Sequence, residues 1–172
     1  MMIYEQFDTP VGLLTVAAEG DELRYIEFPS NRHQVIRADW VLVSLDEAPR
    51  VLRIAREQLL EYFAGTRQTF DLPLRPRGTA FQMRVWRTLA DIPFGQTWSY
   101  KQLAQACGNV NAMRAVGAAN GRNPLPIVLP CHRVIGADGS LTGFGGGIET
   151  KAALLRLEGA LPDAPATPSL FG

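Results

Sequence analysis

The chain changes its pattern of apolar residues once, and a segment rich in proline marks the change. Before residue 72, apolar and polar residues alternate in short runs, whereas after residue 78 the apolar residues recur at helical spacing. Residues 72–78 contain two prolines and a glycine and break both periodicities. We therefore expect two domains, residues 1–76 and 77–160, followed by a Pro/Ala-rich tail over residues 161–172.

The first domain has the pattern of a small α/β unit. Alternation over residues 3–7, 13–17 and 23–28 predicts three antiparallel strands, because successive side chains of a strand point to opposite faces. Apolar residues at helical spacing predict a helix over residues 49–63, and Gly65 is a typical stop signal. A three-stranded sheet with one helix is expected.

The second domain is predicted to be mostly helical. Its first helix begins at Thr79, which can form a capping box with Gln82. Two short helices over residues 100–107 and 111–120 are joined by a glycine turn, which suggests a helix-turn-helix. A last helix is expected over residues 149–158.

The helix expected over residues 111–120 has two contrasting stripes. One is apolar and is predicted to face the core; it comprises Ala112, Ala115, Val116 and Ala119. The other carries one cation among very small residues: Arg114, Gly117, Ala118 and Gly121. Tight packing against another helix and close approach to nucleic acid both explain such a stripe, and Arg114 favours nucleic acid because a core-facing guanidinium needs a partner.

Charge is unevenly distributed although the net charge is zero. Residues 1–76 hold 8 Arg against 12 Asp and Glu, whereas residues 77–172 hold 9 Lys and Arg against 5 Asp and Glu. The excess of positive charge is largest over residues 84–133, which contain six Lys and Arg residues and one acidic residue, Asp91. A basic segment of this kind attracts a polyanion, although a solvated surface also explains it.

Composition restricts the remaining functions. The chain lacks an apolar run of about 18 residues and an N-terminal signal pattern, so a cytoplasmic protein is expected. Its only cysteines are Cys107 and Cys131, and its only histidines are His33 and His132. These are too few for a disulfide framework or a zinc site, so no metal is predicted.

The segment Pro130-Cys-His-Arg-Val134 places a thiol directly beside an imidazole. The thiolate is the nucleophilic form of cysteine, and a neighbouring histidine can help to generate it near neutral pH. A glycine-rich loop follows at residues 143–147, but the lysine and hydroxyl residue of a phosphate-binding loop are missing. Nucleophilic chemistry at Cys131 is therefore the leading functional hypothesis.

The ordered motifs of the second domain resemble the O6-alkylguanine-DNA alkyltransferase family in its stand-alone bacterial-type form. The match is carried by Ser99-Tyr100, Met113-Arg-Ala-Val-Gly117, Asn123-Pro124, Pro130-Cys-His-Arg-Val134, Thr142-Gly-Phe-Gly-Gly146 and Leu154-Leu-Arg-Leu-Glu158-Gly159. The resemblance implies a ribonuclease H-like first domain and a winged helix-turn-helix in the second. It also implies irreversible, stoichiometric transfer of an alkyl group to Cys131 from O6 of guanine in double-stranded DNA, with O4 of thymine as a second candidate and without any cofactor.

The resemblance assigns a role to each matching residue. Cys131 is the nucleophile and alkyl acceptor, His132 its base through a water, Glu158 the group that orients His132, Tyr100 the proton donor to guanine N3, and Asn123 the hinge that positions the turn. Residues implied to contact the flipped base or the minor groove are Arg114 (the finger), Gly117, Ala118, Lys101, Val134, Phe144 and Gly145. A monomer that can assemble cooperatively on DNA is expected.

One residue departs from the family pattern, and other functions stay open. Phe144 stands where the family usually has tyrosine, so any hydrogen bond of that hydroxyl is missing. A protein that binds alkylated DNA without transfer is one alternative, but such relatives lack the acceptor cysteine. A second alternative is a helix-turn-helix transcription regulator, which leaves Cys131, His132 and Glu158 unexplained. A third is a cysteine hydrolase, which predicts repeated turnover of substrate without a permanent adduct.

Overall fold

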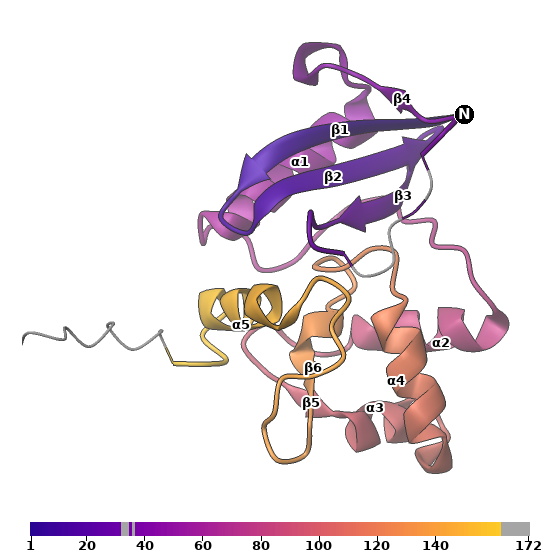
Figure 1. The fold of residues 1–172 in the computed structure, drawn as a ribbon, viewed down its shortest axis with the longest axis vertical. Helices are drawn as coiled ribbons and strands as arrows, with labels where there is room; N and C mark the ends of the chain where they lie inside the picture. The colour runs from indigo at the N-terminus through magenta and orange to yellow at the C-terminus, as the bar shows by residue number, and fades with distance from the viewer. Residues whose placement is uncertain (32–34, 36, 163–172) are drawn as a thin grey trace, which may run out of the picture.

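The structure is a computed structural model that describes residues 1–31, 35 and 37–162. His33 and nearly all of the predicted tail lie outside these residues. Figure 1 shows a sheet-containing unit built from the first part of the chain above a mainly helical unit built from the second. This is the arrangement that the change of periodicity predicts. Every helix within the described ranges is too short or too polar to cross a membrane.

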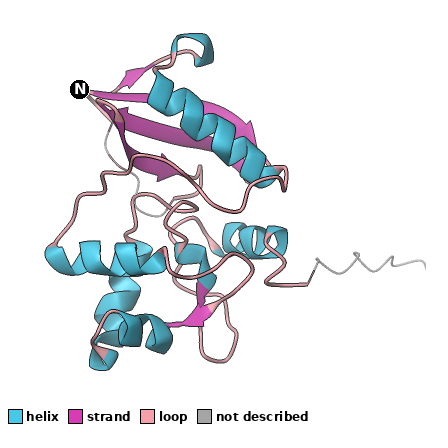
Figure 2. Ribbon diagram, turned by 180° about the vertical axis from the view of Figure 1, so that it is seen from behind, coloured by secondary structure: helices cyan, strands magenta, loops and turns pink. Residues whose placement is uncertain are grey.

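The first unit contains the predicted antiparallel sheet. Its strands are β1 (Met2–Thr9), β2 (Gly12–Glu19) and β3 (Glu22–Glu27), and α1 (Arg50–Phe63) packs against them (Figure 2). A two-residue strand, β4 (Val41–Leu42), adds a parallel edge to give the order β3-β2-β1-β4. The sequence pattern does not predict β4, because two residues are too few to show an alternation.

The segment between the two units is attached to the edge of the sheet. The backbone N–H of Leu23 in β3 donates to Pro73 O at 2.8 Å, and Arg75 N–H donates to Leu23 O at 2.8 Å. These bonds form an isolated parallel bridge between Leu23 and Leu74. The proline-rich segment therefore ends the first unit while remaining hydrogen-bonded to it.

The described part of the second unit contains four α-helices and a small parallel strand pair. The helices are α2 (Ala80–Leu89), α3 (Tyr100–Ala106), α4 (Met113–Gly121) and α5 (Ile148–Leu157), and the strands are β5 (Trp98–Ser99) and β6 (Val134–Ile135). The 3₁₀ turns η1 (Leu45–Glu47), η2 (Val110–Ala112) and η3 (Cys131–Arg133) precede α1, α4 and β6.

Two helices begin with reciprocal capping boxes. The Thr79 hydroxyl accepts from Gln82 N–H at 3.1 Å, and the Gln82 side chain accepts from Thr79 N–H at 3.0 Å, as predicted for α2. Ser99 and Gln102 form the same pair at the start of α3, which the sequence analysis did not identify. Each box satisfies N–H groups that a helix start leaves unbonded and so fixes where its helix begins.

The apolar stripe predicted on α4 is partly wrong. Val116 and Ala119 are buried as expected, but Ala115 is exposed and Asn120 is buried in its place. Positions 116, 119 and 120 follow i, i+3, i+4 spacing and turn towards the helical core, where Trp86 Nε1–H donates to Ala119 O at 2.8 Å. Residue 115 lies one step around the helix, on the solvent side.

Candidate active site

Cys131 is held at the end of a cross-braced turn that runs from residue 123 to residue 130. Asn123 Nδ2 donates to Leu129 O at 2.6 Å, and its Oδ1 accepts from Leu125 N–H at 3.0 Å. Within the turn Ile127 has a φ of 72°, a strained conformation for a β-branched residue. The Asn123 bonds stabilise a turn that the backbone alone would not favour.

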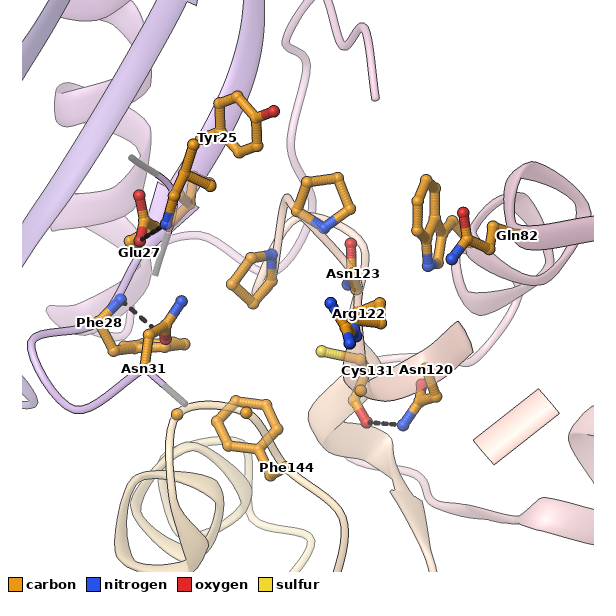
Figure 3. A pocket seen from close by; sticks show the side chains of 18 of the residues that line it. Tyr25, Glu27, Phe28, Asn31, Gln82, Asn120, Arg122, Asn123, Cys131 and Phe144 are labelled. Carbon is orange, nitrogen blue, oxygen red and sulfur yellow. Dashed lines mark hydrogen bonds between the residues drawn. The ribbon is translucent and has the colours of Figure 1, made fainter. Parts of the chain in front are cut away.

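The turn delivers the cysteine to a cleft between the two units. The cleft has a volume of about 260 Å³, and Figure 3 shows the Cys131 sulfur pointing into it. β3 and the residues after it contribute Tyr25, Glu27, Phe28 and Asn31, while the second unit contributes Asn120, Asn123, Phe144 and Gly145. Only 4% of the surface of Cys131 is exposed.

His132 and Glu158 form a buried pair next to the cysteine. His132 Nε2 lies 2.6 Å from Glu158 Oε2, and both side chains are completely buried. Glu158 is the C-cap residue of α5, a position where the helix dipole disfavours a carboxylate. The structure therefore brings together two residues that lie 26 positions apart, as the resemblance implies.

Four N–H and O–H groups surround the Glu158 carboxylate. Besides His132, they are the Tyr62 hydroxyl at 2.6 Å from Oε2, Arg133 Nε at 2.7 Å from Oε1 and Arg133 Nη2 at 3.1 Å from Oε2. Burial alone would raise the pKa of Glu158, but these donors outweigh it and lower the pKa to about 2. Glu158 is therefore ionised and accepts the Nε2 proton of His132.

Burial also keeps the resting imidazole and thiol neutral. Burial lowers the pKa of His132, and the positive charges of Arg133 and Lys151 act in the same direction, while Glu158 opposes them. Burial raises the pKa of Cys131 to about 11 against the opposing effects of Asn123 and Lys151. His132 Nδ1 has no hydrogen-bond partner among the described residues, so its lone pair can accept a proton.

Lys151 is a buried cation beside this group. Its Nζ donates to the carbonyl oxygens of Val134 and, at 2.9 Å, of Thr142, and burial lowers its pKa to about 8. These bonds connect α5 to β6 and to the loop that carries Phe144. Lys151 lies close enough to Cys131 for each charge to affect the other's pKa, so it favours the thiolate.

Tyr100 reaches the same loop from the start of α3. Its hydroxyl donates to Thr142 O at 2.9 Å, and burial raises the pKa of the phenol, as does a negative charge on Cys131. A Cβ on Gly143 would lie 2.8 Å from the Tyr100 oxygen, and the φ of Gly143 is 73°. A side chain at position 143 would displace Tyr100.

The structure separates the remaining predicted residues into two groups. Lys101, Arg114 and Ala118 are exposed and Gly117 is half-buried on α3 and α4, whereas Phe144 and Gly145 line the cleft. Val134 is the exception, because it is fully buried in β6, where its carbonyl accepts from Lys151 Nζ and its N–H donates to Cys131 O. The side chain of Val134 is therefore not available to DNA in this conformation.

Three residues of the site were not singled out by the sequence analysis. Tyr62 was assigned only to the apolar face of the helix over 49–63, Arg133 only to the basic segment and the Pro130–Val134 motif, and Lys151 to no role. Each has a buried polar group that bonds a partner at least nine residues away. The one available signal was an arginine next to the Cys-His pair.

A buried cysteine with an adjacent histidine and an ionised carboxylate is the arrangement of a nucleophile, a base and an orienting group. Two family models match this chain: the ribonuclease-like domain of 6-O-methylguanine DNA methyltransferase over residues 2–76 and its DNA binding domain over residues 80–160. Together they cover most of the sequence. The chain belongs to the 6-O-methylguanine DNA methyltransferase family, which confirms the resemblance.

Relatives along the full length agree with this assignment. The methylated-DNA–protein-cysteine methyltransferase of Mycobacterium tuberculosis is 46% identical over 171 residues, 99% of both chains. The constitutive enzyme of Bacillus subtilis is 45% identical over 159 residues, 92% of this chain and 96% of the relative.

Solved structures show the same fold. The crystal structure of M. tuberculosis OGT in complex with DNA has a TM-score of 0.83 and 46% identity, covering 92% of this chain and 93% of the other. The M. tuberculosis O6-methylguanine methyltransferase has a TM-score of 0.84 and 45% identity, covering 100% of both. The expected order of a sheet-containing domain and a helical domain is thereby confirmed.

Proposed function

We propose that this protein repairs DNA directly, by transferring an alkyl group from O6 of guanine to Cys131. The observation that carries the proposal is the buried array of Cys131, His132 and Glu158, held within a fold shared with a methyltransferase crystallised on DNA. O4 of thymine is a second candidate donor.

The array suits a thiol that is neutral at rest and deprotonated for reaction. The Cys131 proton passes through a water to His132 Nδ1, and the resulting imidazolium is stabilised by Glu158, which accepts its Nε2–H. The thiolate sulfur then attacks the alkyl carbon. The carbon–sulfur bond forms as the carbon–O6 bond breaks, and the bonding electrons remain with the guanine.

The leaving base needs a proton as negative charge develops on it. We assign this to the Tyr100 hydroxyl, which would donate to guanine N3 in place of its bond to Thr142 O. A thioether on Cys131 does not hydrolyse readily, so each molecule acts once. The proton that His132 takes from Cys131 makes up for the one that Tyr100 gives to the guanine, so the transfer balances without a cofactor.

The outer surface of α3 and α4 fits the role of DNA contact. A base inside a duplex cannot reach a buried sulfur, so it must rotate out of the stack. Arg114 is exposed on α4 and would fill the vacated space, while the small residues Gly117 and Ala118 permit close approach to the minor groove and Lys101 contacts the backbone. Phe144 and Gly145 would bound the base pocket. We infer a cytoplasmic monomer that can assemble cooperatively on DNA.

The decisive experiment follows the methyl group by mass. The protein is mixed in equimolar amount with a duplex containing one O6-methylguanine, and intact mass and peptide mass are measured. One methyl group on the Cys131 peptide, with no second turnover, is expected, and Cys131→Ser should remain unmodified.

Two results would reject the proposal. Tight binding with unmodified protein would indicate a lesion-binding protein and implicate Phe144. Repeated release of product from one protein molecule would indicate a hydrolase.

A further inference from the structure

The carboxylate of Glu158, in the second domain, accepts a hydrogen bond from a residue of the first domain. Tyr62 lies in the last turn of α1, 96 residues away from Glu158, and its hydroxyl donates to Glu158 Oε2 at 2.6 Å. Tyr62 is 1% exposed and the Glu158 side chain is 0% exposed, so water does not compete for this bond. Burial next to a carboxylate raises the pKa of Tyr62, so the hydroxyl keeps its proton.

The oxygen that Tyr62 contacts is the one that His132 uses. Both Tyr62 Oη and His132 Nε2 lie 2.6 Å from Oε2, and Arg133 Nη2 lies 3.1 Å from it. Each added donor draws electron density from that oxygen and weakens its attraction for a positive charge on the imidazole. The Tyr62 bond therefore opposes protonation of His132 in the resting protein.

We propose that Tyr62 is a positioning residue that tunes the basicity of His132 through Glu158 and so connects the first domain to the alkyl transfer. The inference rests on the function proposed above. It gives the first domain a chemical role besides its share of the cleft, because the hydroxyl on α1 sets the proton affinity of the base.

Among the residues that the structure describes, the charged and titratable groups that face the His132–Glu158 pair come from three elements. Tyr62 approaches from α1, Cys131 and Arg133 from η3, and Lys151 from α5. Of these groups, Tyr62 has a neutral hydroxyl, which can be removed without changing the charge of the site. Tyr62→Phe therefore isolates the hydrogen bond.

The test uses the chain's small number of histidines. His33 and His132 are the only two, so nitrogen NMR of protein labelled at the imidazoles, compared with a His33→Gln version, reports His132 alone. The pH at which His132 gains its second proton is measured for wild type and Tyr62→Phe. We expect that midpoint to rise by about half to one pH unit, a threefold to tenfold gain in proton affinity.

A matched control separates the hydroxyl from the packing around it. The centroid of the Phe70 ring lies 5.6 Å from that of the Tyr62 ring. Phe70→Leu therefore loosens the packing around the Tyr62 ring but keeps the Tyr62 hydroxyl. It should leave the His132 midpoint at the wild-type value, and thermal unfolding of both variants shows that they are folded. An unchanged or lower midpoint in Tyr62→Phe, or an equal rise in Phe70→Leu, overturns the inference.

The same change should appear in the reaction. Single-turnover methyl transfer on the acidic side of the pH profile should fall threefold to tenfold in Tyr62→Phe, with the plateau at higher pH changed less than about twofold. A uniform loss at every pH would indicate a purely structural role and contradict the inference. Because the NMR titration uses no DNA, failure of the repair proposal would be visible separately.

Discussion

Replacing Glu158 by glutamine should destabilise the protein in a manner that depends on pH. Glutamine has the shape of the protonated acid but cannot carry the charge that Arg133 faces. The folded protein lowers the pKa of Glu158 from an ordinary 4.5 to about 2. At 1.36 kcal/mol per unit, this shift corresponds to about 3 kcal/mol in favour of the ionised form.

The sign of the pH dependence follows from the direction of the shift. A carboxyl group with a lower pKa in the folded chain contributes stability that is complete above 4.5 and is lost as the pH falls towards 2. Glu158→Gln should therefore cost about 3 kcal/mol at pH 7, equivalent to a melting temperature lower by roughly 6–12 °C. The difference from wild type should shrink to about 1 kcal/mol at pH 3.

Urea unfolding at both pH values, followed by tryptophan fluorescence, measures this difference. Glu61→Gln is the matched control: Glu61 also pairs with an arginine, but its side chain is 40% exposed, so a change of no more than about 1 kcal/mol is expected. A loss of equal size at pH 7 and pH 3, or one below 1 kcal/mol at pH 7, would refute the argument that the donors around Glu158 stabilise its charge.

Two further predictions concern the chemistry and the DNA. Tyr100→Phe should slow single-turnover methyl transfer by about 100-fold or more while leaving DNA affinity within about twofold, because it removes only the proton donor; a rate within threefold of wild type would exclude that role. Arg114→Ala should slow transfer from a duplex about 10- to 100-fold but hardly affect single-stranded substrate, since only a duplex must be held open. Arg87→Ala, an exposed cation on α2, is the control, and equal losses on both substrates would contradict the finger assignment.

Features that depend on neighbours along the chain can be predicted from the sequence alone. The three long strands follow from alternation, and the helices from apolar spacing and caps such as the Thr79–Gln82 box. The nucleophile can also be predicted from the sequence, because Cys131 and His132 are adjacent. This reasoning failed for two features. β4 has only two residues, and Ala115 lies next to the buried face of α4 but not on it.

The surroundings of the reactive groups depend instead on tertiary packing. Tyr62, Arg133 and Glu158 meet because α1, η3 and the end of α5 pack at one point, and no local pattern encodes a bond across 96 residues. The burial of Val134 and of the Lys151 amine has the same origin, since exposure is a property of the assembled core. Neighbouring residues thus specify the nucleophile and its base, whereas their protonation states depend on desolvation and on donors that folding brings together.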